Sequence, residues 1–141
     1  MVSKYHDFIT NRLEAGALAA LTAAGINQDA VAVVKVPGAF ELPIAARHAA
    51  SSRQFDAVVC LGCLIRGETP HFEYIASAVA HGITAAAGDT GVPITFGVLT
   101  TNSVEEALAR AGEGSANKGW EAASAAIEMA SVVLKLTARS S

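Results

Sequence analysis

The chain has 141 residues, of which 52% are hydrophobic and only 16% are charged, and its formal net charge is −3. This length fits a single domain, which we expect to span residues 1–141. The lack of a Lys/Arg cluster argues against nucleic acid as a partner. The lack of an uncharged apolar run of about 18 residues argues against a membrane span. The N-terminal residues do not have the layout of a signal peptide, so we expect a cytoplasmic protein.

The first half of the chain alternates helical and extended patterns. Apolar residues recur at helical spacing between residues 7 and 24 and predict a helix there. Residues 31–36 read as a strand, and a Pro-Gly pair then turns the chain into a second helix at about residues 40–51. The continuous apolar run at residues 57–65 predicts a strand that is covered on both faces, as strands of parallel sheets are.

The second half continues the alternation and then closes with two helices. Thr69 as cap and Pro70 in the first turn predict a helix that continues to about residue 87. Residues 93–99 read as the next strand. Residues 103–106, Ser-Val-Glu-Glu, form a capping box for a short helix that ends before residue 112. Asn117 starts the last helix, which is expected to end near residue 138.

This order of elements predicts an α/β fold, a three-layer αβα sandwich around a flavodoxin-like parallel sheet of about four strands. The first strand is truncated, because the first helix begins so early that only residues 1–3 are left for it. Ligands of such sheets bind at the carboxyl ends of the strands. The sequence places residues 36–41, 63–71 and 96–101 there.

The only two cysteines, Cys60 and Cys63, lie on the same predicted strand. Because their spacing is odd, their side chains are expected to point to opposite faces of the sheet. A zinc site would need more ligands at suitable spacing. We therefore expect two buried thiols that pack in the core of a protein from a reducing compartment, and no metal site.

The segment from residue 61 to residue 74 carries the densest set of polar side chains. Residues 62–69 nearly match the nucleotide P-loop, but Glu68 replaces the lysine and would repel a triphosphate. A single phosphate would still fit, because two glycines permit close backbone approach and Thr69 adds a hydroxyl at a helix start. Arg66 could bind the anion or pair with Glu68 or Glu73 at the surface.

Other side chains with chemical potential lie near the predicted strand ends and around a later turn. His71 in a first helical turn could exchange protons near pH 7, or be a solvated surface histidine. Phe40 could stack on a planar ring and Glu41 could accept hydrogen bonds, or the two could merely start a helix. Arg110 and Lys118 flank a Gly-rich turn and could bind an anion from a neighbouring subunit, or simply face solvent.

Several motifs, in the same order along the chain, resemble the lumazine synthase family. They are residues 36–43 (Val-Pro-Gly-Ala-Phe-Glu-Leu-Pro), 62–74, 96–101, 110–112, 117–119 and 126–129. The resemblance implies a transferase of riboflavin biosynthesis. Such an enzyme condenses 5-amino-6-(D-ribitylamino)uracil with 3,4-dihydroxy-2-butanone 4-phosphate to 6,7-dimethyl-8-ribityllumazine, and releases phosphate and water. It also implies that no metal or other cofactor takes part.

The resemblance assigns a role to each matching residue. His71 would be the catalytic proton-transfer residue. The pyrimidine and ribityl pocket would be lined by Tyr5, His6, Phe40, Glu41, Cys63, Leu64 and Ile65. The phosphate would be approached by Gly67, Glu68 and Thr69, while the adjacent subunit would supply Phe96, Arg110 and Lys118.

The resemblance also implies partners. Family members form homo-oligomeric pentamers, some of which assemble into icosahedral shells, and riboflavin synthase is a further expected partner. Subunit interfaces would explain the low charged fraction, since a typical domain has about a quarter of its residues charged.

The chain departs from the family pattern in three places. The first strand is short, the turn at residues 112–116 lacks a Thr-Lys pair, and Tyr5 and His6 stand where phenylalanine and asparagine are usual.

Two other functions remain open on sequence grounds. The chain could be an inactive assembly or ligand-binding protein on the same scaffold, which would form large particles without making product. It could also be a flavodoxin-like mononucleotide binder, which would bind flavin tightly as a monomer.

Overall fold

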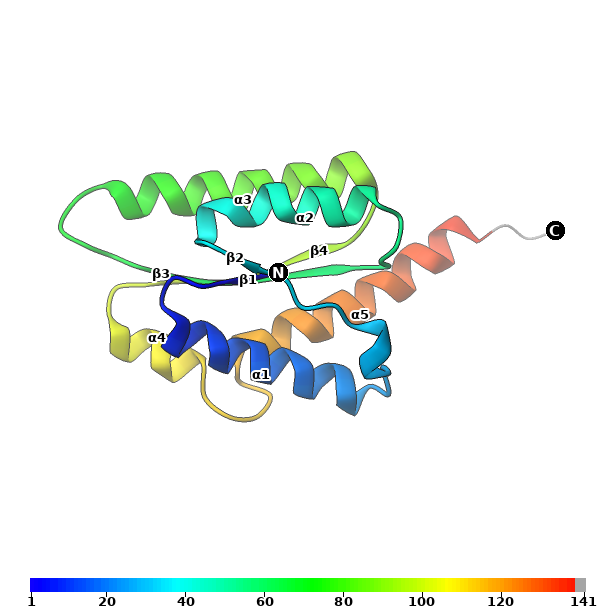
Figure 1. Cartoon of the computed structure of the whole chain (residues 1–141), viewed down its shortest axis with the longest axis horizontal. Coiled ribbons are helices and arrows are strands. Elements are labelled where there is room, and N and C mark those ends of the chain that lie inside the picture. The colour runs from blue at the N-terminus through cyan, green and yellow to red at the C-terminus, as the bar shows by residue number, and fades with distance from the viewer. Residues whose placement is uncertain (139–141) are drawn as a thin grey trace.

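A computed structural model describes residues 1–138 and shows a parallel sheet between two layers of helices (Figure 1). The strands are β1 (Val2–Ser3), β2 (Lys35–Val36), β3 (Val58–Ile65) and β4 (Ile94–Thr101), in the spatial order β2-β1-β3-β4. The α-helices are α1 (Asp7–Ala23), α2 (Leu42–Ser51), α3 (His71–Thr90), α4 (Val104–Arg110) and α5 (Lys118–Thr137). Two short 3-10 turns, η1 (Gln28–Ala30) and η2 (Ala39–Glu41), complete the described elements. The predicted α/β class and four-stranded sheet are confirmed.

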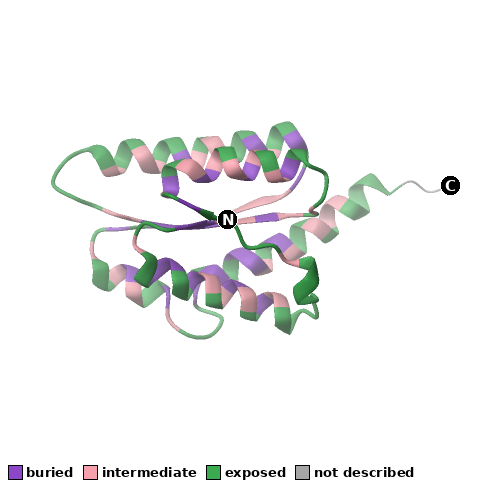
Figure 2. Ribbon diagram, in the orientation of Figure 1, coloured by how far each residue is buried: buried purple, intermediate pink, exposed green. Residues whose placement is uncertain are grey.

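The sheet separates two hydrophobic cores, and the buried residues line both of its faces (Figure 2). Helices α2 and α3 cover one face, while α1, α4 and α5 cover the other (Figure 1). Cys60 packs in the first core and Cys63 in the second, as their odd spacing predicted. Burial raises the pKa of each thiol to about 11. Both cysteines are therefore inert packing residues at neutral pH.

Strand β2 is shorter than predicted because its partner is short. Residues 31–34 were expected to be extended β-structure, but only Lys35 and Val36 form ladder pairs, with Val2 and Ser3 of β1. A strand needs a neighbour to satisfy its backbone groups. With β1 only two residues long, the pairing stops there, and the sequence pattern of residues 31–36 could not show this.

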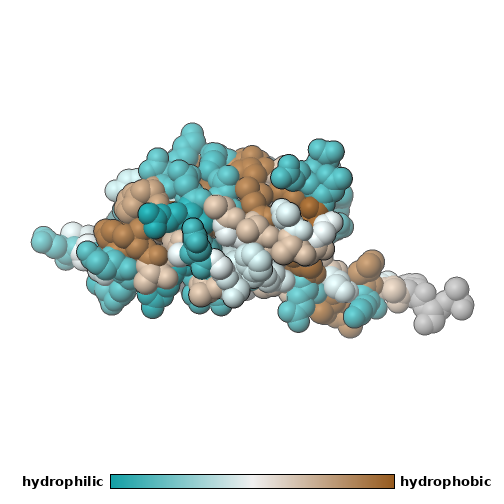
Figure 3. Space-filling model, turned by 90° about the horizontal axis from the view of Figure 1, so that it is seen from below, coloured by the Kyte–Doolittle hydropathy of each residue, from teal (hydrophilic) through white to brown (hydrophobic). Residues whose placement is uncertain are grey.

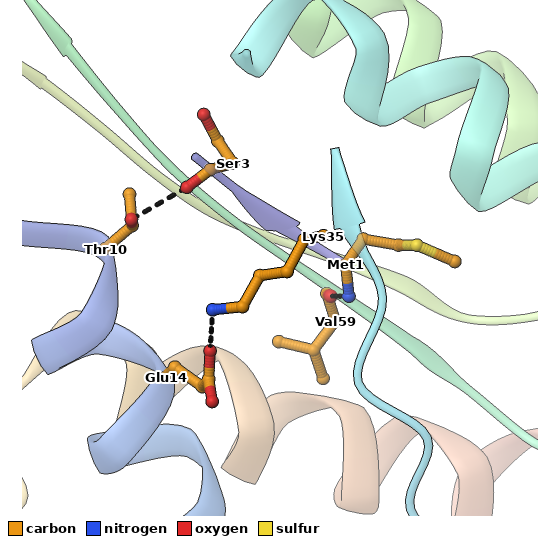
Figure 4. Close-up of polar contacts among 6 residues, drawn as sticks. All are labelled: Met1, Ser3, Thr10, Glu14, Lys35 and Val59. Atoms are coloured by element: carbon orange, nitrogen blue, oxygen red, sulfur yellow. Dashed lines mark hydrogen bonds and ion pairs between the residues drawn. The ribbon is translucent and has the colours of Figure 1, made fainter. Parts of the chain in front are cut away.

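Strand β1 is held by polar contacts on both sides (Figure 4). The Thr10 hydroxyl donates to the Ser3 carbonyl at 2.7 Å, and Lys35 of β2 forms an ion pair with Glu14 of α1. The Met1 amino group donates to the Val59 carbonyl at 2.9 Å. A groove of about 610 Å³ lies next to this strand, between residues 30–34, residues 54–59 and helices α1 and α5. The sheet residues that border this groove, Val2, Val58 and Leu61, are themselves buried.

The start and end of α3 differ from the prediction. Thr69 was expected to cap this helix, but the N-cap position is Pro70 and no side chain makes a cap hydrogen bond. The Pro70 carbonyl accepts the N–H groups of Glu73 and Tyr74, which places Thr69 one residue outside the helix. The helix continues beyond residue 87 to Thr90, where Gly91 ends it in the left-handed conformation.

Helix α5 extends past the sheet, and its final turns are exposed (Figure 1). Leu134 and Leu136 are largely in solvent, and apolar atoms are visible at this end of the helix in Figure 3. Within residues 1–138, no helix combines the length and the hydropathy that a membrane crossing would require.

Candidate active site in two halves

The carboxyl ends of β1 and β2 bring two aromatic side chains to the surface. Beyond the ladder, Lys4 donates to the Val36 carbonyl at 2.8 Å and Tyr5 to the Pro37 carbonyl at 3.2 Å. The segments that follow the two strands therefore run side by side. Tyr5 is 67% exposed and Phe40, in η2, is 61% exposed. Large aromatic rings this open to solvent are available to stack on a planar ligand.

His6 has an unusual backbone conformation at the start of α1. Its φ and ψ are 60° and 48°, in the left-handed region, and its side chain makes no cap hydrogen bond. The imidazole packs edge-on against Tyr5, with ring centres 4.5 Å apart, and burial lowers its pKa below the usual 6.5. A non-glycine residue in this region costs roughly 1–3 kcal/mol and is often found at functional sites.

Partly accessible apolar side chains lie at the carboxyl end of β3. Leu64 and Ile65 are half-buried, whereas Cys63 is only 1% exposed and packs against the α1 and α5 side. Glu41, at the N-cap position of α2, is half-buried and also makes no side-chain cap hydrogen bond. Contacts between a ligand and this strand end would therefore fall mainly on Leu64 and Ile65.

The segment from residue 67 to residue 71 is exposed along its whole length. A Cβ atom built on Gly67 would meet nothing within 4 Å, so a ligand could approach this backbone closely. Thr69 and His71 lie at the uncapped start of α3, where peptide N–H groups lack partners within the helix. This is an arrangement that suits a phosphate next to a proton-transfer group.

Arg66 does not face an open anion site in this structure. Its guanidinium is 2.6 Å from a Glu73 carboxylate oxygen, and its Nε donates to Asn102 at 2.9 Å. Of the two roles that the sequence left open, the structure shows the surface ion pair with Glu73.

A second group of predicted residues lines a hollow of about 490 Å³ along the outer edge of β4. Phe96, Arg110 and Lys118 all border it. Arg110 donates to the carbonyl of Glu106 in its own helix at 3.2 Å, and Lys118 pairs with Glu121 at 2.9 Å. Because β4 is an edge strand, this hollow faces outward, and the side chains of Arg110 and Lys118 both border it.

The position of Phe96 corrects the sequence analysis, which placed it at the carboxyl end of its strand. Strand β4 pairs with β3 over eight residues, from Ile94 opposite Val58 to Thr101 opposite Ile65. Phe96 is the third residue of β4 and lies near its amino end. The strand continues two residues beyond the predicted end because β3 offers partners that far.

The structure therefore brings the predicted residues together as two groups. Within residues 1–138, the lining of the edge hollow includes no member of the first group, which extends from Tyr5 to His71. Sequence reasoning missed two members of these groups. Glu121 could have been found from its i,i+3 spacing to Lys118, whereas nothing in the sequence joins Asn102 to Arg66.

Asn117 fixes the start of α5, which borders the edge hollow. Its buried side chain accepts the N–H groups of Gly119 and Trp120, and donates to the carbonyls of Arg12 and Gly112. Next to it, Gly119 allows α5 to touch α1, since a Cβ there would overlap the Leu13 carbonyl. The start of α5, and with it Lys118, is thus fixed against α1.

Comparison with known proteins gives one consistent result. The family model described as 6,7-dimethyl-8-ribityllumazine synthase matches residues 1–133. The 6,7-dimethyl-8-ribityllumazine synthase of Syntrophus aciditrophicus (strain SB) is 53% identical over 135 residues, which cover 96% of this chain and 88% of that relative.

Proposed function

Since the chain belongs to the 6,7-dimethyl-8-ribityllumazine synthase family, we propose that it performs the lumazine synthase reaction at sites that two neighbouring copies build together. The reaction joins 5-amino-6-(D-ribitylamino)uracil to 3,4-dihydroxy-2-butanone 4-phosphate, in riboflavin biosynthesis. It yields 6,7-dimethyl-8-ribityllumazine, phosphate and water. Residues 1–141 would act as one lumazine synthase-like domain.

The observation that carries this proposal is the separation of the two groups of residues. The group from Tyr5 to His71 lies at the carboxyl ends of β1, β2 and β3, whereas Phe96, Arg110 and Lys118 line a hollow on the outer edge of β4. Each group alone lacks something that the reaction needs. Among the described residues, the arginine of the first group, Arg66, is already paired with Glu73, whereas the lining of the edge hollow includes Arg110 and Lys118 and no histidine.

The proposed roles follow from the chemistry of each group. Tyr5 and Phe40 offer exposed rings for the pyrimidinedione, with His6, Glu41, Leu64 and Ile65 around the ring and ribityl chain. Cys63 is buried, so it would contribute by supporting the end of β3 that carries Leu64 and Ile65. Gly67, Glu68 and Thr69 would approach the phosphate, and Arg110 and Lys118 of the neighbouring copy would balance its charge.

Imine formation, elimination and ring closure each require proton movement, which we assign to His71. The uracil 5-amino group attacks the ketone carbon, and water leaves as the imine forms. A carbon-bound proton is then removed as phosphate departs, and the resulting enol tautomerises to a ketone. The ribitylamino nitrogen attacks this ketone and closes the ring with loss of water. General acid–base catalysis typically contributes about 100- to 10,000-fold, and the orientation of two bound substrates contributes further.

The surface supports assembly into a homo-oligomer, which we propose is a pentamer or a shell of pentamers. Besides Tyr5 and Phe40, Ile44 is 62% exposed and Tyr74 72% exposed. Apolar surface of this kind is usually covered by another subunit. A head-to-tail ring would bring the edge hollow of one copy to the strand ends of the next in every interface. Riboflavin synthase is a further proposed partner, as the enzyme that would use the product.

Subunit mixing tests the composite site. We expect His71→Ala and Arg110→Ala homo-oligomers both to have little activity, the second through weaker use of the butanone phosphate. When the two variants are unfolded and refolded together, about a quarter of the interfaces of a random ring should combine an intact His71 with an intact Arg110. Lumazine fluorescence should recover accordingly.

Two results would contradict the proposal. Mixed oligomers that stay as inactive as their parents would place both residues in the site of a single chain. A wild-type protein that assembles but makes no lumazine from the two substrates would favour a non-enzymatic assembly protein. Co-purification through an affinity tag on one of the two variants shows whether mixing took place, and light scattering on the same samples reports whether the oligomers re-formed.

A further inference from the structure

Arg66 connects three parts of the molecule although it lies at the surface. Its backbone N–H donates to the Thr101 carbonyl at 2.8 Å, which continues the β3–β4 pairing by one bond. Its Nε donates to the Asn102 side chain at 2.9 Å, and its guanidinium donates to Glu73 at 2.6 Å. The same guanidinium lies over the Phe72 ring, 4.7 Å from the ring centre. One side chain thus joins the ends of β3 and β4 to the first turn of α3.

The loop that Arg66 spans has little else to hold it. Residues 67–70 are exposed, and the start of α3 has no side-chain cap. The backbone bonds of this region run from Glu73 and Tyr74 to Pro70, inside the helix start itself. The guanidinium is therefore the side-chain link between the helix start that carries His71 and the neighbouring end of β4.

The far end of this link is itself fixed. The Asn102 N–H donates to a Glu106 carboxylate oxygen at 2.9 Å, and the Glu106 N–H donates to the Ser103 hydroxyl at 3.1 Å. Asn102 is therefore held by the N-terminal cap of α4. A line of hydrogen bonds runs from α4 through Asn102 and Arg66 to Glu73 in α3.

We propose that Arg66 is a positioning residue, which fixes Thr69 and His71 relative to β4 and α4. This inference rests on the proposed function, because it assigns Arg66 a part in presenting those two residues to substrate. A planar guanidinium can hold two acceptors at fixed angles, which a lysine cannot do. A displacement of about 1 Å at a reacting group can cost about 100-fold in rate, whereas exposed ion pairs contribute little to stability. The role should therefore appear in turnover rather than in folding.

Replacement of Arg66 tests this role against a matched control. We expect Arg66→Met to lower kcat about tenfold or more, and Arg66→Lys to lower it less, because lysine keeps the Glu73 pair but loses the Asn102 bond. The control is Arg47→Met, which removes an ion pair with Asp89 of similar length, 2.9 Å, and similar exposure, 41% for Arg47 against 46% for Arg66. It should leave kcat within about twofold, with melting temperature and assembly checked in both variants.

A double-mutant cycle with Asn102 separates positioning from direct phosphate binding. If Arg66 acts through Asn102, Asn102→Ala should lower kcat, and the double variant should be no worse than Arg66→Met alone. If Arg66 instead leaves Glu73 and binds the phosphate, Arg66→Met should raise KM for the butanone phosphate while Asn102→Ala has no effect. That second pattern, or an unchanged kcat in Arg66→Met, would overturn the proposal.

Amide hydrogen exchange makes the inference testable apart from the reaction. Arg66→Met should speed exchange of residues 67–72 severalfold relative to wild type, while Arg47→Met leaves these residues unchanged. Faster exchange in a protein that makes no lumazine would retain the structural link and reject the proposed function. Normal exchange in Arg66→Met would reject the link, whether or not the wild type is active.

Discussion

The helix starts around the two halves of the site differ in how their N–H groups are used. Helices α1, α2 and α3 follow the ends of β1, β2 and β3, and their N-cap residues His6, Glu41 and Pro70 make no side-chain cap hydrogen bond. Helices α4 and α5 border the edge hollow, and both are capped, by Ser103 and Asn117. Side chains therefore cap the helices that border the edge hollow, whereas the helices that follow β1, β2 and β3 have no side-chain cap.

The difference in capping fits the different roles proposed for the two groups of residues. A site that must receive a phosphate and exchange protons benefits from unsatisfied donors and an exposed loop. In the proposed composite site, the edge group would only have to present two cations to a neighbouring copy, and a fixed backbone would keep Arg110 and Lys118 in place. Side-chain caps stabilise the helix starts at the edge hollow, and the helix starts at the strand ends do without this stabilisation.

The largest expected effect comes from removing the cap of α5. Asn117→Ala should destabilise the protein by about 2–4 kcal/mol, because it leaves two carbonyls and two N–H groups, all buried or partly buried in these bonds, without the partners that the side chain provides. Ser103→Ala, at the half-buried cap of α4, should cost only about 1 kcal/mol. Urea denaturation of both variants measures the difference. Equal losses would show that the edge half owes no special stability to Asn117.

The second effect concerns turnover in the open half. His71→Ala should lower kcat about 100-fold or more, with stability within about 0.5 kcal/mol of wild type because the side chain is exposed. His81→Ala is the matched control, an exposed histidine of the same helix whose Nδ1 lies 2.8 Å from the Ser77 carbonyl, one turn earlier. Steady-state kinetics with both substrates should separate the two variants. Similar rates in both would remove His71 from the mechanism.

The sequence predicted the elements whose signals are local. The apolar run of β3, the Ser103 cap of α4 and the Asn117 start of α5 were all found in place. The predicted capping box forms in part, because the Glu106 carboxylate accepts the N–H of Asn102 in place of that of Ser103. The opposite faces of Cys60 and Cys63 followed from strand periodicity alone. In each case the residues that determine the structure are close neighbours in the sequence.

The errors arose where a distant partner decides the outcome. Strand β2 begins only where β1 offers a partner, at Lys35 opposite Val2, and β4 extends as far as β3 does, so neither length is encoded in its own residues. Threonine is a common N-cap residue, yet the N-cap position of α3 is Pro70, whose carbonyl accepts the N–H groups of Glu73 and Tyr74. The resemblance named the site residues and assigned Phe96, Arg110 and Lys118 to a neighbouring subunit, but residue patterns could not show that Asn102 holds Arg66.

The smallest expected effect concerns strain at the start of α1. Replacement by glycine should relieve the left-handed backbone at His6, and at Arg53, whose φ is 63°, with a gain of up to about 1 kcal/mol each. Only His6→Gly should also lower turnover, because Arg53 lies outside the residues assigned to the site. The two variants thus distinguish strain that serves the site from strain that does not.

The pH dependence of stability is a second way to distinguish His6 from Arg53. Burial lowers the pKa of His6 in the folded protein, so between that pKa and about 6.5 the unfolded chain binds more protons than the folded one. The stability that His6 contributes is therefore present above about pH 6.5 and is lost as the pH falls toward the folded pKa. Denaturation of wild type should show this slope, Arg53→Gly should keep it, and His6→Gly should reduce it. An unchanged slope in His6→Gly would mean that other groups titrate there and that the His6 imidazole is solvated as freely in the folded protein as in the unfolded chain.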